Sequence, residues 1–390
     1  MTPSSFARLW VAIALAGAVL AAACGSGSTP AAPKATSGGG AAAATSAPAK
    51  PAAAPAAAPT AAAAPQASAP GRVETVRIAE TAAIAYAPVY VANARGFYRE
   101  VGLELEFENF AGGADVVPAL ARGDFDLNLG AISAGTFNAF ERGLDIKIVA
   151  PMGILPRQDS SLPMLLRKEL ADSGAVREVA DLRGRKIAVN TRGAIVEYLL
   201  AKVLERGNMT LADVDEVPLA FPDHAAALTT GAIDASITAE PFATRALGTG
   251  SATKFIAEIA PLRMTTVVMA SGKSIRERQD VLRRWMVATM RGARELQGPE
   301  LGVTYTDKVF TPDNMAVFEQ ATGATAQVIR DQVPYTWDPD LEIQTDFIYD
   351  QELVHIRNGV LQLPQPIPAE RLVDDSFVRH AQQVLGKARP

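Results

Sequence analysis

The chain has 390 residues and a formal net charge of −5 at pH 7. Residues 1–72 hold four basic side chains and no acidic one, so the rest of the chain, with 33 basic and 42 acidic side chains, carries a formal charge of −9. An acidic region without a basic block excludes the usual binding surfaces for nucleic acid and for anionic membranes, and one cysteine with three scattered histidines offers no zinc-ligand spacing. We expect no metal and no cofactor.

The amino terminus predicts export. Leu9–Leu20 is an apolar run of twelve residues behind Arg8, the length of a signal-peptide core and too short to span a bilayer. The only cysteine, Cys24, follows the three small residues Ala21–Ala23. Since exported chains rarely keep a free cysteine, a plain signal peptide with an incidental cysteine is the weaker alternative.

The stretch LAAAC resembles the lipobox of bacterial lipoproteins, although Ala21 stands where leucine is usual. The resemblance implies that residues 1–23 are a lipoprotein signal peptide and that Cys24 is lipidated, with palmitate among its acyl chains. It also implies that the protein is anchored to the extracytoplasmic face of the cell membrane. Residues 25–71 are almost entirely Ala, Pro, Gly, Ser and Thr, so we expect 24–72 to be a disordered tether without chemistry of its own.

An internal repeat organises the rest of the chain. Ala119–Asp126 recurs as Ala227–Asp234, each predicted as a helix end, a left-handed glycine and an aspartate that opens a strand. Upstream, Val76–Tyr98 aligns with Arg185–Gly207, each read as a strand, a small-residue loop and an amphipathic helix. Two βαβαβ modules predict an α/β fold with mostly parallel sheets, whose ligands bind beyond the carboxyl ends of the strands.

Three stretches carry a family resemblance. Tyr86–Gly113 resembles the first-helix signature of ABC-importer solute-binding proteins of the nitrate/sulfonate/taurine and thiamine-precursor (pyrimidine) branch. Asp181–Gly207 and Gly231–Phe242 resemble second-lobe elements of that family. The resemblance implies a monomeric binding protein that captures a small-molecule solute and delivers it to a membrane ABC permease with its ATPase.

The same resemblance implies a type 2 periplasmic-binding fold, in which two α/β lobes are joined by two crossing strands with the ligand cleft between them. The first lobe would combine residues 73–160 with a largely helical part, 270–390, and the second would be 168–265. The crossing strands would lie within Ser161–Lys168 and Thr265–Lys273.

The strand-end rule nominates side chains from both modules as ligand contacts. They are Glu80, Thr81, Tyr86, Ser133, Asn190, Thr191, Arg192, Gly193, Thr238 and Glu240. Each also has a plain structural reading: Asn190 and Thr191 as helix caps, Ser133 and Thr238 as partners of nearby backbone, and Glu240 as the partner of Arg192 or another base. Trp337 is either a stacking platform at the cleft or half-buried core.

The rim chemistry slightly favours a heteroaromatic solute, such as a thiamine-precursor pyrimidine or riboflavin. Aromatic faces would come from Tyr86, Phe110, Phe221 and Phe242, with amide and carboxylate partners from Asn190, Glu80 and Glu240. A nitrate, sulfonate or taurine-type anion is the alternative, and it would depend on Arg192, the only base at the named positions.

An enzyme is the remote alternative. Ala131–Gly135 is one residue short of the G-x-S-x-G turn of a serine hydrolase, with Ser133 as nucleophile and His355 or His380 as base. The leading glycine is absent and no oxyanion-hole run follows, so we expect no enzymatic activity.

Overall fold

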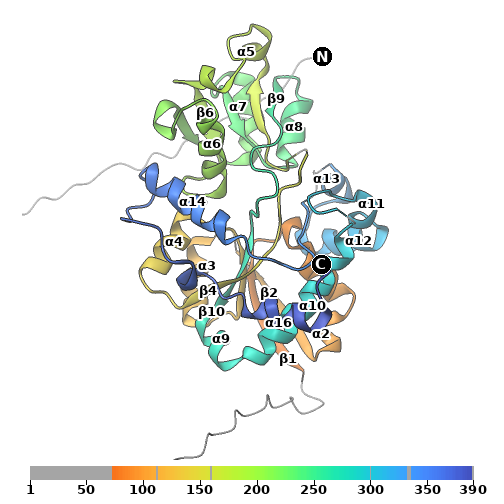
Figure 1. Ribbon diagram of the computed structural model, residues 1–390. Coiled ribbons are helices and arrows are strands. Elements are labelled where there is room, and N and C mark those ends of the chain that lie inside the picture. The colour runs from red at the N-terminus through yellow and green to blue at the C-terminus, as the bar shows by residue number, and fades with distance from the viewer. Residues whose placement is uncertain (1–72, 111–112, 159, 299, 332–334, 389–390) are drawn as a thin grey trace, which may run out of the picture. The chain divides into compact units, whose positions relative to one another are not determined.

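The computed structural model describes residues 73–110, 113–158, 160–298, 300–331 and 335–388. The predicted signal peptide, Cys24 and the tether lie outside these residues. The described part is built around two five-stranded mixed sheets with helices packed around them (Figure 1). This agrees with the predicted α/β class.

The first sheet has the strand order β2-β1-β3-β10-β4. Its parallel pairs join β1 to β2 and β3, whereas β10 runs antiparallel to both of its neighbours. The strands span β1 (Glu74–Glu80), β2 (Leu103–Asn109), β3 (Leu127–Gly130), β4 (Ile146–Pro151) and β10 (Val267–Ser271).

The second sheet has the order β7-β6-β8-β5-β9, and here β5 is the antiparallel strand. Its strands are β5 (Met164–Arg167), β6 (Lys186–Val189), β7 (Asp215–Pro218), β8 (Ala235–Ile237) and β9 (Ala252–Ile256). The chain therefore passes twice between the sheets, from β4 to β5 and from β9 to β10. On each pass it enters the new sheet as an antiparallel strand.

Helices cover both sheets, and the part after β10 is helical, as predicted. The α-helices are α1 (Ala87–Ala94), α2 (Phe97–Glu100), α3 (Gly113–Arg122), α4 (Ala134–Glu141), α5 (Lys168–Asp172), α6 (Ile195–Glu205), α7 (His224–Thr230), α8 (Phe242–Gly248), α9 (Gly272–Glu277), α10 (Gln279–Leu296), α11 (Thr306–Val309), α12 (Pro312–Thr322), α13 (Ala326–Arg330), α14 (Thr345–Arg357), α15 (Ala369–Leu372) and α16 (Ser376–Leu385). Short 3-10 helices are η1 (Ile84–Tyr86), η2 (Val179–Leu182), η3 (Leu211–Asp213) and η4 (Phe221–Asp223).

The two repeated glycines end their helices as the sequence predicts. Gly123 follows α3 with φ +79° and Gly231 follows α7 with φ +73°, a backbone conformation that costs glycine little because it has no Cβ. The aspartate three residues later directly precedes the next strand in both modules, β3 in one and β8 in the other. The repeat is therefore structural as well as sequential.

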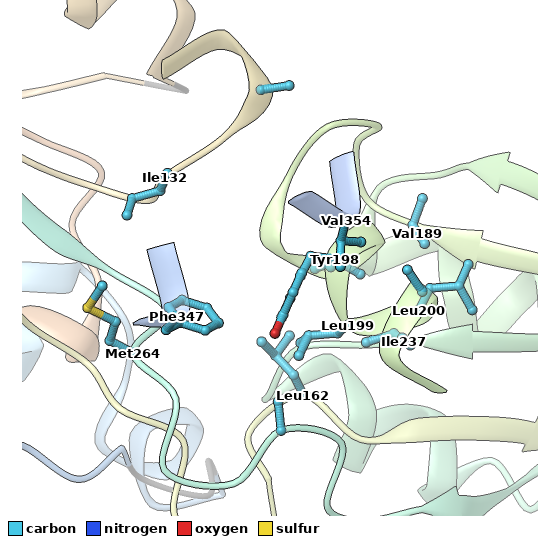
Figure 2. Packing of buried hydrophobic residues seen from close by; sticks show 14 of the residues in the cluster. Ile132, Leu162, Val189, Tyr198, Leu199, Leu200, Ile237, Met264, Phe347 and Val354 are labelled. Atoms are coloured by element: carbon cyan, nitrogen blue, oxygen red, sulfur yellow. The ribbon is translucent and has the colours of Figure 1, made fainter. Parts of the chain in front are cut away.

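One group of buried apolar side chains is continuous from elements of the first sheet to elements of the second. Helix α14 contributes Phe347 and Val354 to it, and these pack with Ile132 from the loop after β3 and with Tyr198 and Leu199 of α6 (Figure 2). The rings of Phe347 and Tyr198 meet edge to face with centroids 5.3 Å apart. Helix α14 thus touches elements associated with both sheets, α4 and α6, a contact that sequence periodicity does not reveal.

Candidate functional site

The loops that follow the parallel strands bring the two modules into contact. We call the segments 80–86, 130–134, 190–193 and 238–242 the strand-end loops. The backbone N–H of Ala134, after β3, donates to the carbonyl of Gly193, after β6, at 2.8 Å. A Cβ on Gly193 would lie 2.9 Å from the Ala134 Cβ, so the glycine permits this close approach.

Tyr86 and Thr81 lie together on the first module, with the Tyr86 hydroxyl 3.4 Å from the Thr81 hydroxyl oxygen. Tyr86 is 1% exposed, and burial raises its pKa far above the ordinary value. Tyr335 lies beside it: burial raises the pKa of Tyr335, and the neighbouring hydroxyls of Ser161 and Thr265 offset part of that rise. The two segments that connect the sheets thus supply hydroxyls next to a predicted contact.

Sequence reasoning did not find Tyr335, Ser161 or Thr265. Their common feature is that they lie in or against the connecting segments between β4 and β5 and between β9 and β10. A search of those segments for hydroxyls would have nominated Ser161 and Thr265. Tyr335 comes from the carboxyl-terminal part, which the repeat does not cover, so nothing in the repeat points to it.

Glu80 lies near enough to Tyr86 for its charge to help raise the Tyr86 pKa, but its side chain lines a different cavity. Its carboxylate accepts a hydrogen bond from the Tyr90 hydroxyl at 2.7 Å and faces a separate cavity beside α1. Burial raises the pKa of Glu80, and the Tyr90 hydrogen bond offsets part of that rise. Phe110 also lies apart from Tyr86, packing edge to face on Phe125 with ring centroids 5.6 Å apart.

Ser133 occupies the amino-terminal cap of α4. Its hydroxyl accepts from the Thr136 N–H at 3.3 Å, and its own N–H donates to the Thr136 hydroxyl at 3.3 Å. Among the described residues, no hydrogen bond joins Ser133 to a histidine. The side chain is therefore engaged as the capping residue that its alternative reading describes, and the arrangement a serine nucleophile needs is not formed.

In the second module, Asn190 has a side-chain atom that no described residue hydrogen-bonds. Its side-chain oxygen is buried without a hydrogen-bond partner among the described residues. Thr191 is exposed, and the helix cap falls on Ala194, so the capping reading of Thr191 is wrong. The Gly193 N–H donates to the Glu197 carboxylate at 2.9 Å, and this bond fixes the loop just before α6.

Arg192 points to the surface. Its side chain is 64% exposed, and it pairs with the Glu216 carboxylate at 3.1 Å and donates to the Glu216 carbonyl at 3.0 Å. Glu216 is buried and lies against Glu197, which together raise its pKa to about 7 despite the guanidinium. A base held by a buried carboxylate is less available to an anionic solute than an unpaired one.

Thr238 is held by an internal hydrogen-bond chain. Its hydroxyl oxygen is 2.8 Å from the His224 Nδ1 and 2.7 Å from the Ser236 hydroxyl. The other ring nitrogen of His224 lies 2.8 Å from the Leu219 carbonyl, so that nitrogen donates and Nδ1 accepts from Thr238. Burial lowers the pKa of His224, which keeps this neutral form.

Glu240 and Phe242 follow β8, and Phe221, which follows β7, stacks on Phe242. The Glu240 carboxylate accepts from the Thr244 N–H at 2.9 Å, and burial raises the pKa of Glu240. Phe221 and Phe242 stack with centroids 6.3 Å apart and an interplanar angle of 19°. Trp337, by contrast, is core: it is 1% exposed and donates to the Ala85 carbonyl at 2.9 Å.

Two buried polar side chains of α14, Gln351 and His355, lie beside the contact between the strand-end loops of the two modules. The Gln351 amide donates to the Ile132 carbonyl at 3.1 Å, and the His355 Nδ1 lies 3.6 Å from a Glu197 carboxylate oxygen. The Gln351 carbonyl oxygen and both ring nitrogens of His355 are buried without a hydrogen-bond partner among the described residues. Sequence reasoning considered His355 only as a hydrolase base.

Two further observations concern the described part of the chain. No cluster of three or more His, Cys, Asp or Glu side chains there has a geometry that could hold a metal ion. None of the helices there is both long and apolar enough to cross a membrane.

Comparison with known proteins gives a family and a fold. A family model described as NMT1/THI5 like matches residues 83–299. No curated protein matches the sequence.

Among solved structures, the ligand-binding component of an ABC-type import system from Staphylococcus aureus, with zinc bound, has a TM-score of 0.61 and 14% identity, covering 79% of this chain and 99% of that one. The periplasmic aliphatic sulphonate binding protein SsuA from Escherichia coli has a TM-score of 0.58 and 18% identity, covering 77% and 92%. The desulfurization enzyme DszB has a TM-score of 0.55 and 16% identity, covering 79% and 99%. The chain therefore has the predicted periplasmic-binding fold, which it shares with binding proteins and with an enzyme.

Proposed function

The chain belongs to the NMT1/THI5-like family, and from this premise we propose that it is the extracytoplasmic solute-binding component of an ABC importer. Two of its structural neighbours are named as binding proteins, one of them a component of an ABC-type import system. The observation that carries the proposal is the meeting of the strand-end loops, where Ala134 of one module bonds Gly193 of the other. A solute held there would touch both modules.

The proposed mechanism is hinge closure. Two segments, 152–163 and 257–266, connect the sheets, and rotation about them would part or join the strand-end loops as two lobes. A solute with contacts on both lobes binds the closed form better than the open form, so it shifts the population toward closure. The membrane permease would recognise the closed form and accept the solute.

The side chains near the strand-end loops favour a heteroaromatic solute with ring N–H or amino donors. The half-buried Tyr335, next to the buried Tyr86, offers aromatic surface beside the connecting segments, and the half-buried Phe221–Phe242 stack offers it on the second module. The unpartnered oxygen of Asn190 and the carboxylate of Glu240 accept hydrogen bonds. A thiamine-precursor pyrimidine or riboflavin fits this chemistry.

A nitrate, sulfonate or taurine-type anion is the second candidate, favoured only by the fold shared with a sulphonate-binding protein. It would need a free positive charge at the loops. The only arginine in these loops, Arg192, is paired with Glu216. The Glu197 carboxylate lies against that of Glu216, so an anion would meet repulsion there.

No covalent chemistry is proposed. Ser133 caps α4 and has no histidine partner among the described residues, so the hydrolase alternative has little to support it. The proposed localisation is the outer face of the cell membrane, where Cys24 carries the lipid anchor of a monomeric protein. Replacing Cys24 with alanine should move the protein from the membrane fraction to the soluble exported fraction, and unchanged membrane association would contradict the anchor.

The solute class is tested by calorimetry with an aminopyrimidine, riboflavin, taurine and nitrate against three proteins. We expect the wild type to bind a heteroaromatic, Glu240→Gln to weaken that binding about tenfold through loss of a charged acceptor, and Arg192→Ala to leave it unchanged. Tight binding of taurine or nitrate that disappears in Arg192→Ala would replace the heteroaromatic class by the anionic one. Failure of all four to bind, repeated over a wide metabolite panel, would contradict the binding role itself.

A further inference from the structure

A cavity of about 280 Å³ lies on the flank of the first sheet, and it shares only Glu80 with the strand-end loops. Its walls come from the ends of β1 and β2 and from α1 and α12. Its volume lies just below the range for ligand pockets, about 300–1,000 Å³, so it suits a molecule of one ring or less.

A buried carboxylate faces this cavity. Glu80 is 3% exposed, and its carboxylate accepts a hydrogen bond from the Tyr90 hydroxyl at 2.7 Å. The described residues that line the cavity include no basic side chain. An ionised carboxylate in such surroundings is costly unless a positive charge or further donors reach it, and burial accordingly raises the pKa of Glu80.

The remaining walls suit the two ends of a small organic cation. Three side-chain amides line the cavity without a side-chain hydrogen bond to any described residue: Asn93, Asn109 and Gln320. The rings of Tyr90 and Phe107 also line it and meet edge to face with centroids 6.2 Å apart. Amide oxygens accept ammonium N–H bonds, and aromatic rings attract cations and pack on apolar groups.

We propose that this cavity is a second binding site, for a small organic ammonium ion, with the Glu80 carboxylate as its anionic partner. The amides orient the ammonium group, and the Tyr90 and Phe107 rings hold the apolar part. Glu80 is the only residue of the strand-end loops among the described residues that line this cavity, and the others belong to α1, β2 and α12. The proposal therefore does not rest on the transport role. Strand β1 continues from Glu80 directly into the loop that holds Thr81 and Tyr86, so an occupant would stiffen one wall of the main candidate site.

The test uses benzylammonium as the probe, with benzyl alcohol and benzoate as its neutral and anionic counterparts. Saturation-transfer NMR and calorimetry on the purified full-length protein should give a dissociation constant on the order of 1 mM for benzylammonium, as expected for so small a ligand. Benzyl alcohol and benzoate should bind at least tenfold more weakly.

Two variants test separately whether binding needs the Glu80 carboxylate and whether it needs the empty volume of the cavity. Glu80→Gln keeps an acceptor for Tyr90 and should weaken benzylammonium binding about tenfold or more. Glu108→Gln is the matched control, because Glu108 lies on the same β2 end but lines a different cavity, and it should change nothing. Ala321→Phe fills the cavity without changing a charge and should abolish binding, which keeps the test decisive if Glu80→Gln folds poorly.

Absence of benzylammonium binding, equal binding of benzyl alcohol, or unchanged binding in Ala321→Phe would each overturn the proposal. None of these results would bear on solute binding at the strand-end loops. Conversely, loss of transport solutes in a Glu240 variant would leave the benzylammonium result intact. The two sites can therefore fail separately.

Discussion

The two modules are nearly identical at the amino ends of their third strands. Asp126 accepts from the Arg77 N–H at 2.9 Å, and its counterpart Asp234 accepts from the Lys186 N–H at 3.1 Å. Each aspartate also donates its own N–H to the same residue's carbonyl, at 2.9 and 2.8 Å. Each carboxylate is then closed by an arginine from the antiparallel-strand side: Arg278 in the first module, Arg167 in the second.

The same modules differ at the carboxyl ends of those strands. Ser133, the cap of α4 in the first module, corresponds to Pro241 in the second. Glu80, buried at the end of β1, corresponds to Val189 at the end of β6. The comparison teaches that the hydrogen bonds at the amino ends are the same in both modules, whereas the carboxyl-end loops, where we propose the solute site, differ.

The aspartate–arginine pairs at the amino ends of the third strands, Asp126–Arg278 and Asp234–Arg167, predict the largest effect of substitution. Asp126→Ala leaves the Arg278 guanidinium without its carboxylate at a site where the aspartate side chain is 6% exposed, so we expect a loss of about 3 kcal/mol in the free energy of unfolding. Asp234→Ala breaks a pair exposed by 16% and 22% and should cost about 1–2 kcal/mol. Urea unfolding of both variants measures the difference, and equal losses would show that the two pairs are not graded by burial.

Helix α14 has no counterpart in either module, and its buried Glu352 should make stability depend on pH. Burial raises the pKa of Glu352 to about 7, although the Ile367 N–H donates to it. Because the folded-state pKa lies above the unfolded value, the folded state favours the protonated carboxyl. The contribution of Glu352 to the free energy of unfolding is therefore full below about pH 4.5 and is lost as the pH rises through about 7. Wild type should lose about 2 kcal/mol between pH 5 and 8 relative to Glu352→Gln, as measured by urea unfolding at each pH. Parallel pH profiles would contradict the assignment.

The repeated glycines predict a smaller effect that is matched in the two modules. Gly123→Ala and Gly231→Ala force a Cβ into the left-handed region and against the flexible side chains of Lys273 and Arg167 respectively, and should each cost about 1–2 kcal/mol. Gly135→Ala is the control, because it lies in α4 with φ outside that region and meets only the Ser133 hydroxyl, at 3.5 Å. Thermal unfolding should separate the first two from the third, and an equal cost for all three would argue against the backbone explanation.

The contrast between the amino-end pairs and the carboxyl-end loops also marks how far the sequence could predict this molecule. The modules, the left-handed glycines and the aspartates before the strands are local patterns, and the structure confirms them. Side-chain directions at strand ends are not local. Glu80 ends β1 and Thr81 begins the loop after it, so strand alternation does not relate the two side chains: Glu80 lines the flank cavity, whereas the Thr81 hydroxyl lies 3.4 Å from that of Tyr86.

Non-local pairing accounts for the rest. Arg192 looks available in the sequence, but β7 brings Glu216 beside it. Gln351 and His355 reach the junction only because α14 returns to pack on α4 and α6. Neither contact has a spacing signal, since both depend on which elements pack together. A proposed site that combines two modules and a returning helix is therefore only partly predictable from its strand ends.

The central claim is that the strand-end loops of the two modules close on a solute, and small-angle scattering with bound solute tests it most directly. The solute would first be identified by the calorimetric panel. At saturation the account predicts a smaller radius of gyration than in the free protein, because closure brings the lobes together. Replacing Gly193 with valine, whose side chain would collide with Ala134, should reduce the compaction. An unchanged radius of gyration at saturating solute would contradict the account.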